Sequence, residues 1–250
     1  MKKILTALTC AAIVTTTAMA DITRVELGAG AWMQTPEGTA TYTDGGADGS
    51  YLSSKNDNTE SYVWALIKHP IPVLPNLRLE YTSLTDEGVV SGKFKDFDVA
   101  IGSTTMSYDM KQYDIIPYYN ILDNTAWITL DLGLDIKVID ISYDVTPIAG
   151  ITGDLIGSET IAIPLLYARA RVEIPATDIG IEADVKYISF DSNTMYDVRV
   201  KADYTLDFVP IIQPALEVGY RVQKIETDDS VDSNLNIEFS GVYAGLIFRF

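Results

Sequence analysis

The sequence contains a single cysteine, Cys10, and a single histidine, His69. One cysteine cannot form an intrachain disulfide, and these two residues are too few for the His/Cys ligand clusters of zinc sites. Hydrolases of the triad type need a histidine base, and His69 directly precedes Pro70 at the predicted end of a strand. The sequence therefore predicts no catalytic residue, no metal site and no cofactor.

Positive charge and long apolar runs are scarce as well. The chain has 18 basic against 35 acidic residues and a formal net charge of −17. Because a protein this acidic repels polyanions, nucleic acid is excluded as a predicted partner. Beyond the N-terminal segment, no stretch approaches the roughly 18 consecutive apolar residues of a transmembrane helix.

The first twenty residues have the features of a secretory signal peptide. Lys2 and Lys3 precede a mostly apolar run over 4–15, and Ala18-Met19-Ala20 fits the small-residue rule for cleavage. We expect residues 1–20 to be removed and residues 21–250 to form one domain. Cys10 lies inside the removed segment, so the mature chain is expected to be exported without a disulfide.

The abundant feature is alternation of apolar and polar residues, which is typical of β-strands. It is clearest from Gly241 to Phe250, where every second residue is apolar up to the last one. The pattern predicts an all-β, antiparallel up-and-down barrel of ten strands at about 23–34, 60–69, 76–85, 107–121, 125–140, 161–174, 179–190, 195–207, 215–226 and 235–250. Eight strands are the alternative if 60–69 and 107–121 are not strands, and twelve if 89–105 adds two.

Two environments fit such strands. In a soluble barrel the apolar face is the core, whereas in a transmembrane barrel it meets lipid and the polar face lines the lumen. The predicted signal peptide and the aromatic Phe250 favour a barrel in the bacterial outer membrane. Predicted connections alternate between long (35–59, 86–106, 141–160) and short, which places both termini on the periplasmic side.

Two segments also resemble a functionally uncharacterised family of bacterial outer-membrane β-barrel proteins named for a Gly-Gly element. They are LGAGAW at 27–32 and KHPIPVLPNLRLEY at 68–81, and Gly45-Gly46 is the candidate counterpart of the element. The resemblance implies the fold and the location, and it brings no substrate or catalytic residue. It also implies that Phe248 and Phe250 act as an assembly signal, with outer-membrane lipids and the barrel-assembly machinery as partners.

The predicted inward-facing positions carry nearly balanced charge, ten basic against eleven acidic residues. Buried ions must be paired, and a barrel of ten strands is narrower than open porins of about 16–18 strands. We therefore predict a lumen plugged by ion pairs. The predicted network consists of Arg169, Arg171, Glu182, Asp184, Asp197, Arg199, Lys201, Asp203, Glu217 and Arg221.

The sequence-based interpretation is a non-enzymatic outer-membrane protein with a structural or surface-interaction role. The alternative is a narrow channel for small solutes or cations, which acidic external loops would attract. Oxygen-rich loops can hold divalent cations, so these are a candidate partner, although no spacing matches a calcium-loop motif.

Overall fold

The computed structural model describes residues 23–44, 47–71, 73–94, 97–145, 151–153, 156–206, 212–229 and 233–250. The predicted signal peptide and Gly45-Gly46 lie outside these ranges. In these ranges no helix is long and apolar enough to cross a membrane, and the regular elements are strands.

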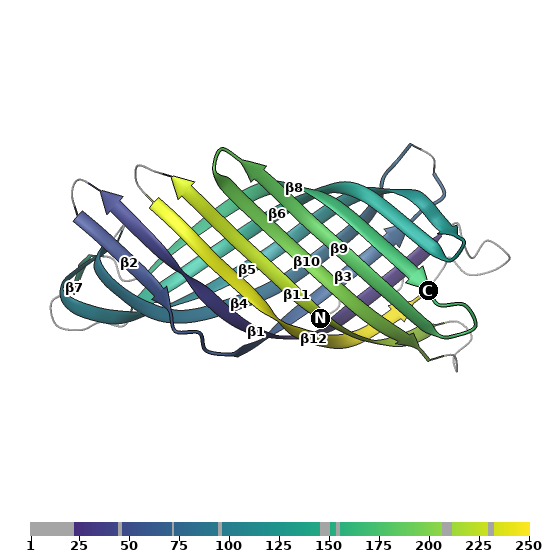
Figure 1. Cartoon of the computed structure of the whole chain (residues 1–250), viewed down its shortest axis with the longest axis horizontal. Helices are drawn as coiled ribbons and strands as arrows, with labels where there is room; N and C mark the ends of the chain where they lie inside the picture. The colour runs from purple at the N-terminus through teal and green to yellow at the C-terminus, as the bar shows by residue number, and fades with distance from the viewer. Residues whose placement is uncertain are drawn as a thin grey trace, which may run out of the picture.

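Ten strands form a closed antiparallel barrel, which confirms the predicted fold class and strand number (Figure 1). Neighbours in the chain are neighbours in the wall, and β1 pairs with β12 to close it, with Trp32 opposite Tyr243. The barrel strands are β1 (Arg24–Asp44), β3 (Asn58–Lys68), β4 (Asn76–Phe94), β5 (Phe97–Thr125), β6 (Ile128–Val145), β8 (Ile156–Glu173), β9 (Ile179–Phe190), β10 (Asn193–Thr205), β11 (Gln213–Asp229) and β12 (Ser233–Arg249).

Two short strands extend the wall at one end, which we call the upper end (left in Figure 1). β2 (Ala47–Ser53) pairs with both β1 and β4 and so continues the wall above β3. β7 (Ile151–Gly153) pairs with the first residues of β5. The opposite end, which carries the C-terminus, is called the lower end.

Most of the predicted long connections are strands in the structure, so this part of the prediction was wrong. β4 and β5 pair as a hairpin from Asn76 to Phe94, with one register shift between Ser91 and Gly92. The prediction ended strands where outward-facing residues become polar, but the backbone ladder continues past that point.

The polarity of both barrel faces inverts along the strands. In the lower part of β12, Val242, Leu246 and Phe248 face outward and are 42–47% exposed. In its upper part the inward-facing Phe239 and Ile237 are buried instead. The lower outer face is an apolar belt that includes Leu27, Met33, Val63, Ile67, Leu79, Ile115, Leu132, Leu134, Ile136, Leu166, Ile181, Val185, Val200, Leu216, Val218, Val242, Leu246 and Phe248.

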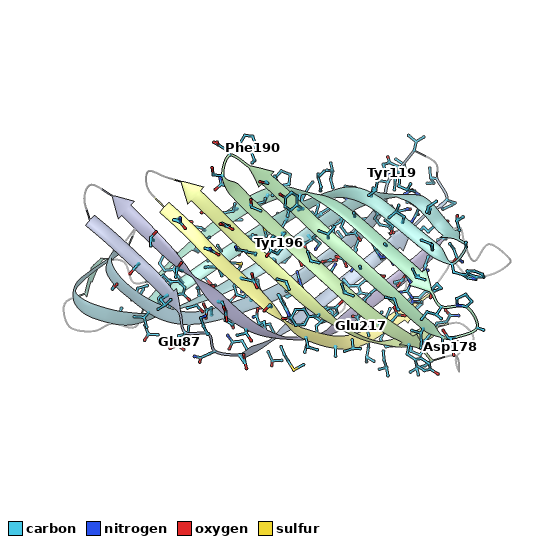
Figure 2. All side chains as sticks on the ribbon, viewed as in Figure 1. Glu87, Tyr119, Asp178, Phe190, Tyr196 and Glu217 are labelled. Carbon is cyan, nitrogen blue, oxygen red and sulfur yellow. The ribbon has the colours of Figure 1, made fainter. Side chains whose placement is uncertain are left out.

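Aromatic side chains lie at both edges of the apolar belt. At its upper edge Tyr187 lies opposite Tyr196, and Tyr81 packs beside Tyr113 with ring centroids 5.2 Å apart. At the lower edge Tyr119, Trp127, Tyr204 and Phe250 are each about half exposed, and Figure 2 labels Tyr119 and Tyr196. Other tyrosines point into the barrel, which the sequence pattern did not predict, namely Tyr51, Tyr62, Tyr108, Tyr118, Tyr167 and Tyr243.

Candidate functional site: the barrel interior

The interior behind the apolar belt is filled with charged side chains, which we call the charged layer. Alternation directs them inward, and each is at most 7% exposed. The cations are Arg78, Lys137, Arg169, Arg171, Lys186, Arg199, Lys201, Arg221 and Arg249. The carboxylates are Glu26, Glu80, Asp114, Asp131, Asp135, Glu182, Asp184, Asp197, Asp203 and Glu217.

One group of ion pairs lies toward the lower end. Arg169 donates to Asp131 at 2.6 Å and to Glu182 at 2.7 Å. Arg171 donates to both carboxylate oxygens of Asp203, at 2.5 and 3.1 Å. Because Arg171 also lies 3.5 Å from Glu182, these residues form one connected set.

A second group connects opposite walls of the barrel. Arg199 on β10 lies 2.8 Å from Asp184 on the neighbouring β9 and 2.6 Å from Glu80 on β4. β4 is not a neighbour of β10 in the sheet, so the contact with Glu80 crosses the bore. Lys186 on β9 also reaches Glu80, at 2.6 Å.

The remaining predicted network residues belong to the same arrangement. Arg221 pairs with Asp197 at 2.6 Å, and Lys201 pairs with Glu217 at 2.9 Å. Arg78 contacts Glu80 at 2.5 Å and Glu182 at 3.5 Å, and it thereby links the two groups. The structure therefore brings all ten predicted network residues into one cluster, joined through Arg78 and Glu80 on β4 and Lys186 on β9.

Two tryptophans fill the space between these ions. The indole of Trp64 lies between Arg78 and Lys201, whose charged groups are 4.8 and 4.7 Å from a ring centroid. Trp32 stacks in the same way against Arg221, at 4.6 Å. A cation over an aromatic face is stabilised by the ring quadrupole, so the rings hold the charges as well as occupy volume.

The aromatic contribution was missed from the sequence, although a signal for it exists. Gly28 and Gly30 on β1 lie directly opposite Trp64 and Tyr62 on β3. A Cβ on Gly28 would meet the Trp64 indole, so a residue without a side chain is needed there. Two inward glycines facing two large aromatic residues indicate that the rings lean across the neighbouring strand into the barrel.

Little free space is left beside the tryptophans. The cavity bounded by Trp32, Trp64, Arg199 and Glu217 has a volume of about 10 Å³, the room needed by about one water molecule. Tyr62 donates a hydrogen bond to Glu217 at 2.8 Å along its wall.

Asp135 differs from the other carboxylates of the charged layer. It is fully buried, and neither of its oxygens has a hydrogen-bond partner among the described residues. Its direct neighbour on β8 is the apolar Leu165. The other nine carboxylates each contact at least one cation, so nine cations face nine paired carboxylates and one unpaired carboxyl group.

Above the charged layer come the buried side chains of Gln34, Gln112 and Gln223, and beyond them the interior is mainly apolar; we call this part the apolar layer. Its buried side chains are Leu84, Val90, Met106, Met110, Ile139, Val145, Met195, Ile225, Ile237 and Phe239. The outer face at this height is polar, as in a water-soluble barrel. The apolar layer was also missed. Val90, Met106 and Val145 fall in predicted connections, and the inward face of the predicted strands was expected to be polar along its whole length.

One polar pair is enclosed in the apolar layer. The Tyr51 hydroxyl donates to Asp86 at 2.5 Å, and Tyr108 packs against the Tyr51 ring. Burial, with Tyr108 and Asp86 beside it, raises the pKa of Tyr51 well above its usual range. Asp86 was predicted to lie in a solvated loop, but its side chain is buried because it points inward from β4.

The lower end holds the two other features that the sequence singled out. The backbones of Val25 and Phe250 exchange hydrogen bonds of 2.9 and 3.3 Å, so the last residue completes the β1–β12 seam. His69 bonds through its ring nitrogens to the Pro75 carbonyl at 2.9 Å and the Ile71 amide at 3.2 Å. The histidine side chain therefore stabilises the proline-rich turn between β3 and β4 through these two hydrogen bonds.

The acidic segments, for which divalent cations are a candidate partner, are only partly described. Asp57 accepts a hydrogen bond from Thr35 at 2.6 Å, and Glu60 accepts one from Thr85 at 2.5 Å. In the described part of the chain, no three His, Cys, Asp or Glu residues are grouped as a metal site. Asp96, Asp154 and Asp232 lie outside it.

Comparison with known proteins places the fold. No protein-family model and no curated protein matches the sequence. Among solved structures, the outer membrane protease OmpT from Escherichia coli is similar, with a TM-score of 0.54 at 12% identity over 95% of this chain and 99% of that one. The translocator domain of the autotransporter NalP from Neisseria meningitidis gives a TM-score of 0.42 at 14% identity, over 100% of this chain and 94% of that one.

The fold is thus that of the bacterial outer-membrane β-barrels. At 12% identity the likeness to OmpT extends to the architecture and not to an activity.

Proposed function

We propose that this protein is an integral β-barrel of the bacterial outer membrane, with the apolar belt in lipid and both termini in the periplasm. On β6 the belt covers eleven positions, 128–138, which agrees with the roughly 9–11 residues that a tilted transmembrane strand needs. The aromatic residues at both belt edges are typical of membrane–water interfaces. The long polar part of the wall above the belt supports an external position for the upper end, because bacterial outer-membrane barrels have short periplasmic turns and longer external extensions.

We further propose that the lumen is closed to ions and that the protein has a structural or surface-interaction role. The observation that supports this most directly is the stacking of the charged layer beneath the apolar layer. An ion entering from the upper end would have to cross the apolar layer without its hydration shell. It would then have to displace ion pairs that bridge opposite walls, such as Lys186 with Glu80.

Single-channel recording in planar lipid bilayers tests this proposal. The unmodified protein should show no steady conductance, because both layers are filled. The double variant Trp64→Ala/Phe239→Ala removes one large side chain from each layer and should admit leak currents, which shows that the assay detects an open bore. Steady, cation-selective conductance of the unmodified protein would overturn the proposal in favour of a narrow cation channel.

A further inference from the structure

The barrel wall has a notch above the β9–β10 hairpin. β8 pairs with β6 along its whole length, up to Ile156 beside Asp144. On its other side, the described ladder between β8 and β9 ends at Leu166 beside Tyr187. The β9–β10 hairpin turns at Asp191 and Ser192, and it ends well short of the upper end in Figure 1.

The upper part of β8 is accessible on both faces. Residues 158–162 are all exposed, although they lie within a strand and not at its end. Ile161 is 44% exposed although it points inward, and its β6 neighbour Ile139 is buried. Phe190, at the tip of the hairpin below, is 75% exposed and is labelled in Figure 2.

An open strand edge presents backbone donors and acceptors to a further strand. Pro164, which is restricted to edge positions within a sheet, stands at the lower end of the open stretch. The open stretch over 157–163 has the apolar side chains of Ile161 and Phe190 beside it, together with the inward-facing carboxylate of Glu159.

We propose that the edge at 157–163 binds an extended segment of a partner protein by strand addition. Strand addition takes its affinity from main-chain hydrogen bonds and its specificity from alternate side chains. The outer face beside the edge carries the carboxylates of Asp140 and Asp144 on β6, whereas Glu226 on β11, across the notch, is ion-paired with Lys224 at 2.9 Å. The segment that fits alternates apolar side chains facing inward with Lys or Arg facing outward.

A second copy of this chain does not fit the edge. Two barrels in one membrane are related by an axis along the membrane normal, and such an axis leaves the upward component of each strand unchanged. Strands tilted by about 35–45° then cross at a large angle instead of running antiparallel. The inference rests on the proposed membrane location, because that location fixes this orientation.

The binding test uses the full-length protein in lipid nanodiscs and a fluorescent peptide of alternating Lys and Val, nine residues long. Fluorescence anisotropy should show saturable binding, and hydrogen exchange should show protection gained at 157–163. A peptide of alternating Glu and Val should bind at least tenfold more weakly. Ile161→Lys should also weaken binding of the Lys/Val peptide at least tenfold, since it adds like charge and removes the apolar contact.

The matched control is Val89→Lys, because Val89 is also exposed above the belt but lies on a strand paired on both sides. Binding to this variant should be unchanged. Equal binding by the Ile161 and Val89 variants, or protection located elsewhere, would overturn the inference. Protection of 157–163 in the free protein would also overturn it, since the chain or a second copy then covers the edge.

The bilayer recordings keep the two proposals separate. A conducting protein that still gains protection at 157–163 would refute the closed lumen and leave the edge site standing. A closed protein without this protection would refute the edge site alone.

Discussion

Lys186 on β9 and Glu80 on β4 meet at 2.6 Å inside the barrel, although 106 residues separate them in the chain. Their strands are not neighbours in the sheet, so the contact joins opposite walls. Lys186 also contacts Asp114 at 2.6 Å and Asp197 at 3.6 Å. A single ammonium group thereby holds carboxylates from three strands.

The first prediction concerns this ammonium group. Lys186→Met removes the cation and leaves buried carboxylates without it, so the free energy of unfolding should fall by about 3–5 kcal/mol. Denaturant unfolding in detergent micelles measures the change. Lys111→Met, on the exposed outer face, serves as the control and should alter stability little. Equal stability of the two variants would contradict a cross-wall role for Lys186.

Asp135 gives a second prediction with the opposite sense. Its carboxyl group has no partner among the described residues, so Asp135→Asn removes a costly buried acid and should leave stability unchanged or raise it. Asp197→Asn changes the same atoms but weakens the contacts with Arg221, Lys137 and Lys186, and it should cost about 3–5 kcal/mol. Thermal unfolding of both variants tests the ranking, and similar losses would mean that Asp135 has a partner.

Sequence alone identified the ten strands because alternation is local and needs no knowledge of the partner strand. Because every second residue shares a face, alternation also groups the ten network residues on one face of their strands, whereas Asp86 was assigned to a connection and points inward. The sequence could not predict which of these charges contact each other across the bore. That Glu80 meets both Lys186 and Arg199 depends on how far the sheet is sheared when it closes, and alternation along one strand carries no information on that shift.

The apolar layer was missed for a different reason. At Ser240 and Glu238 the outer face of β12 becomes polar, although the strand predicted over 235–250 continues past them. The inward residues become apolar at the same height, so the period of two continues with its faces exchanged. The exchange at Phe239 and Ile237 was the available signal that the interior becomes apolar above the belt.

The third prediction follows from the close approach of Gly28 and Trp64. In Gly28→Ala the new Cβ forces the indole to move, which disturbs its contacts with Arg78 and Lys201. The expected loss of stability is about 1–3 kcal/mol, as for other overpacked sites. Tryptophan fluorescence should shift as well. Ala29→Val, on the outward face one residue away, is the control and should change neither quantity.

A fourth prediction tests the position of the apolar belt. Leu132 points outward at the middle of the belt on β6, and arginine near the bilayer midplane costs about 2–4 kcal/mol. Leu132→Arg should lower the stability of the folded barrel in lipid vesicles by that amount. Ser142→Arg lies on the same face of the same strand but above the belt, and it should be tolerated. Similar losses for both would mean that the belt is placed wrongly along the strand.

The last prediction concerns Phe250, whose backbone bonds to Val25 close the barrel at the lower end. Deleting it removes these two hydrogen bonds and the aromatic group at the lower belt edge, so insertion into the outer membrane should fall sharply. The measurement is the amount of heat-modifiable barrel in outer-membrane fractions. Phe250→Tyr keeps both the backbone and an aromatic ring and should assemble normally, whereas Phe250→Ser keeps the backbone alone. If the serine variant assembles as well as the parent while the deletion variant does not, the backbone hydrogen bonds of the β1–β12 seam, and not the aromatic ring, are needed for assembly. Normal assembly of the deletion variant would rule out an assembly role for this residue.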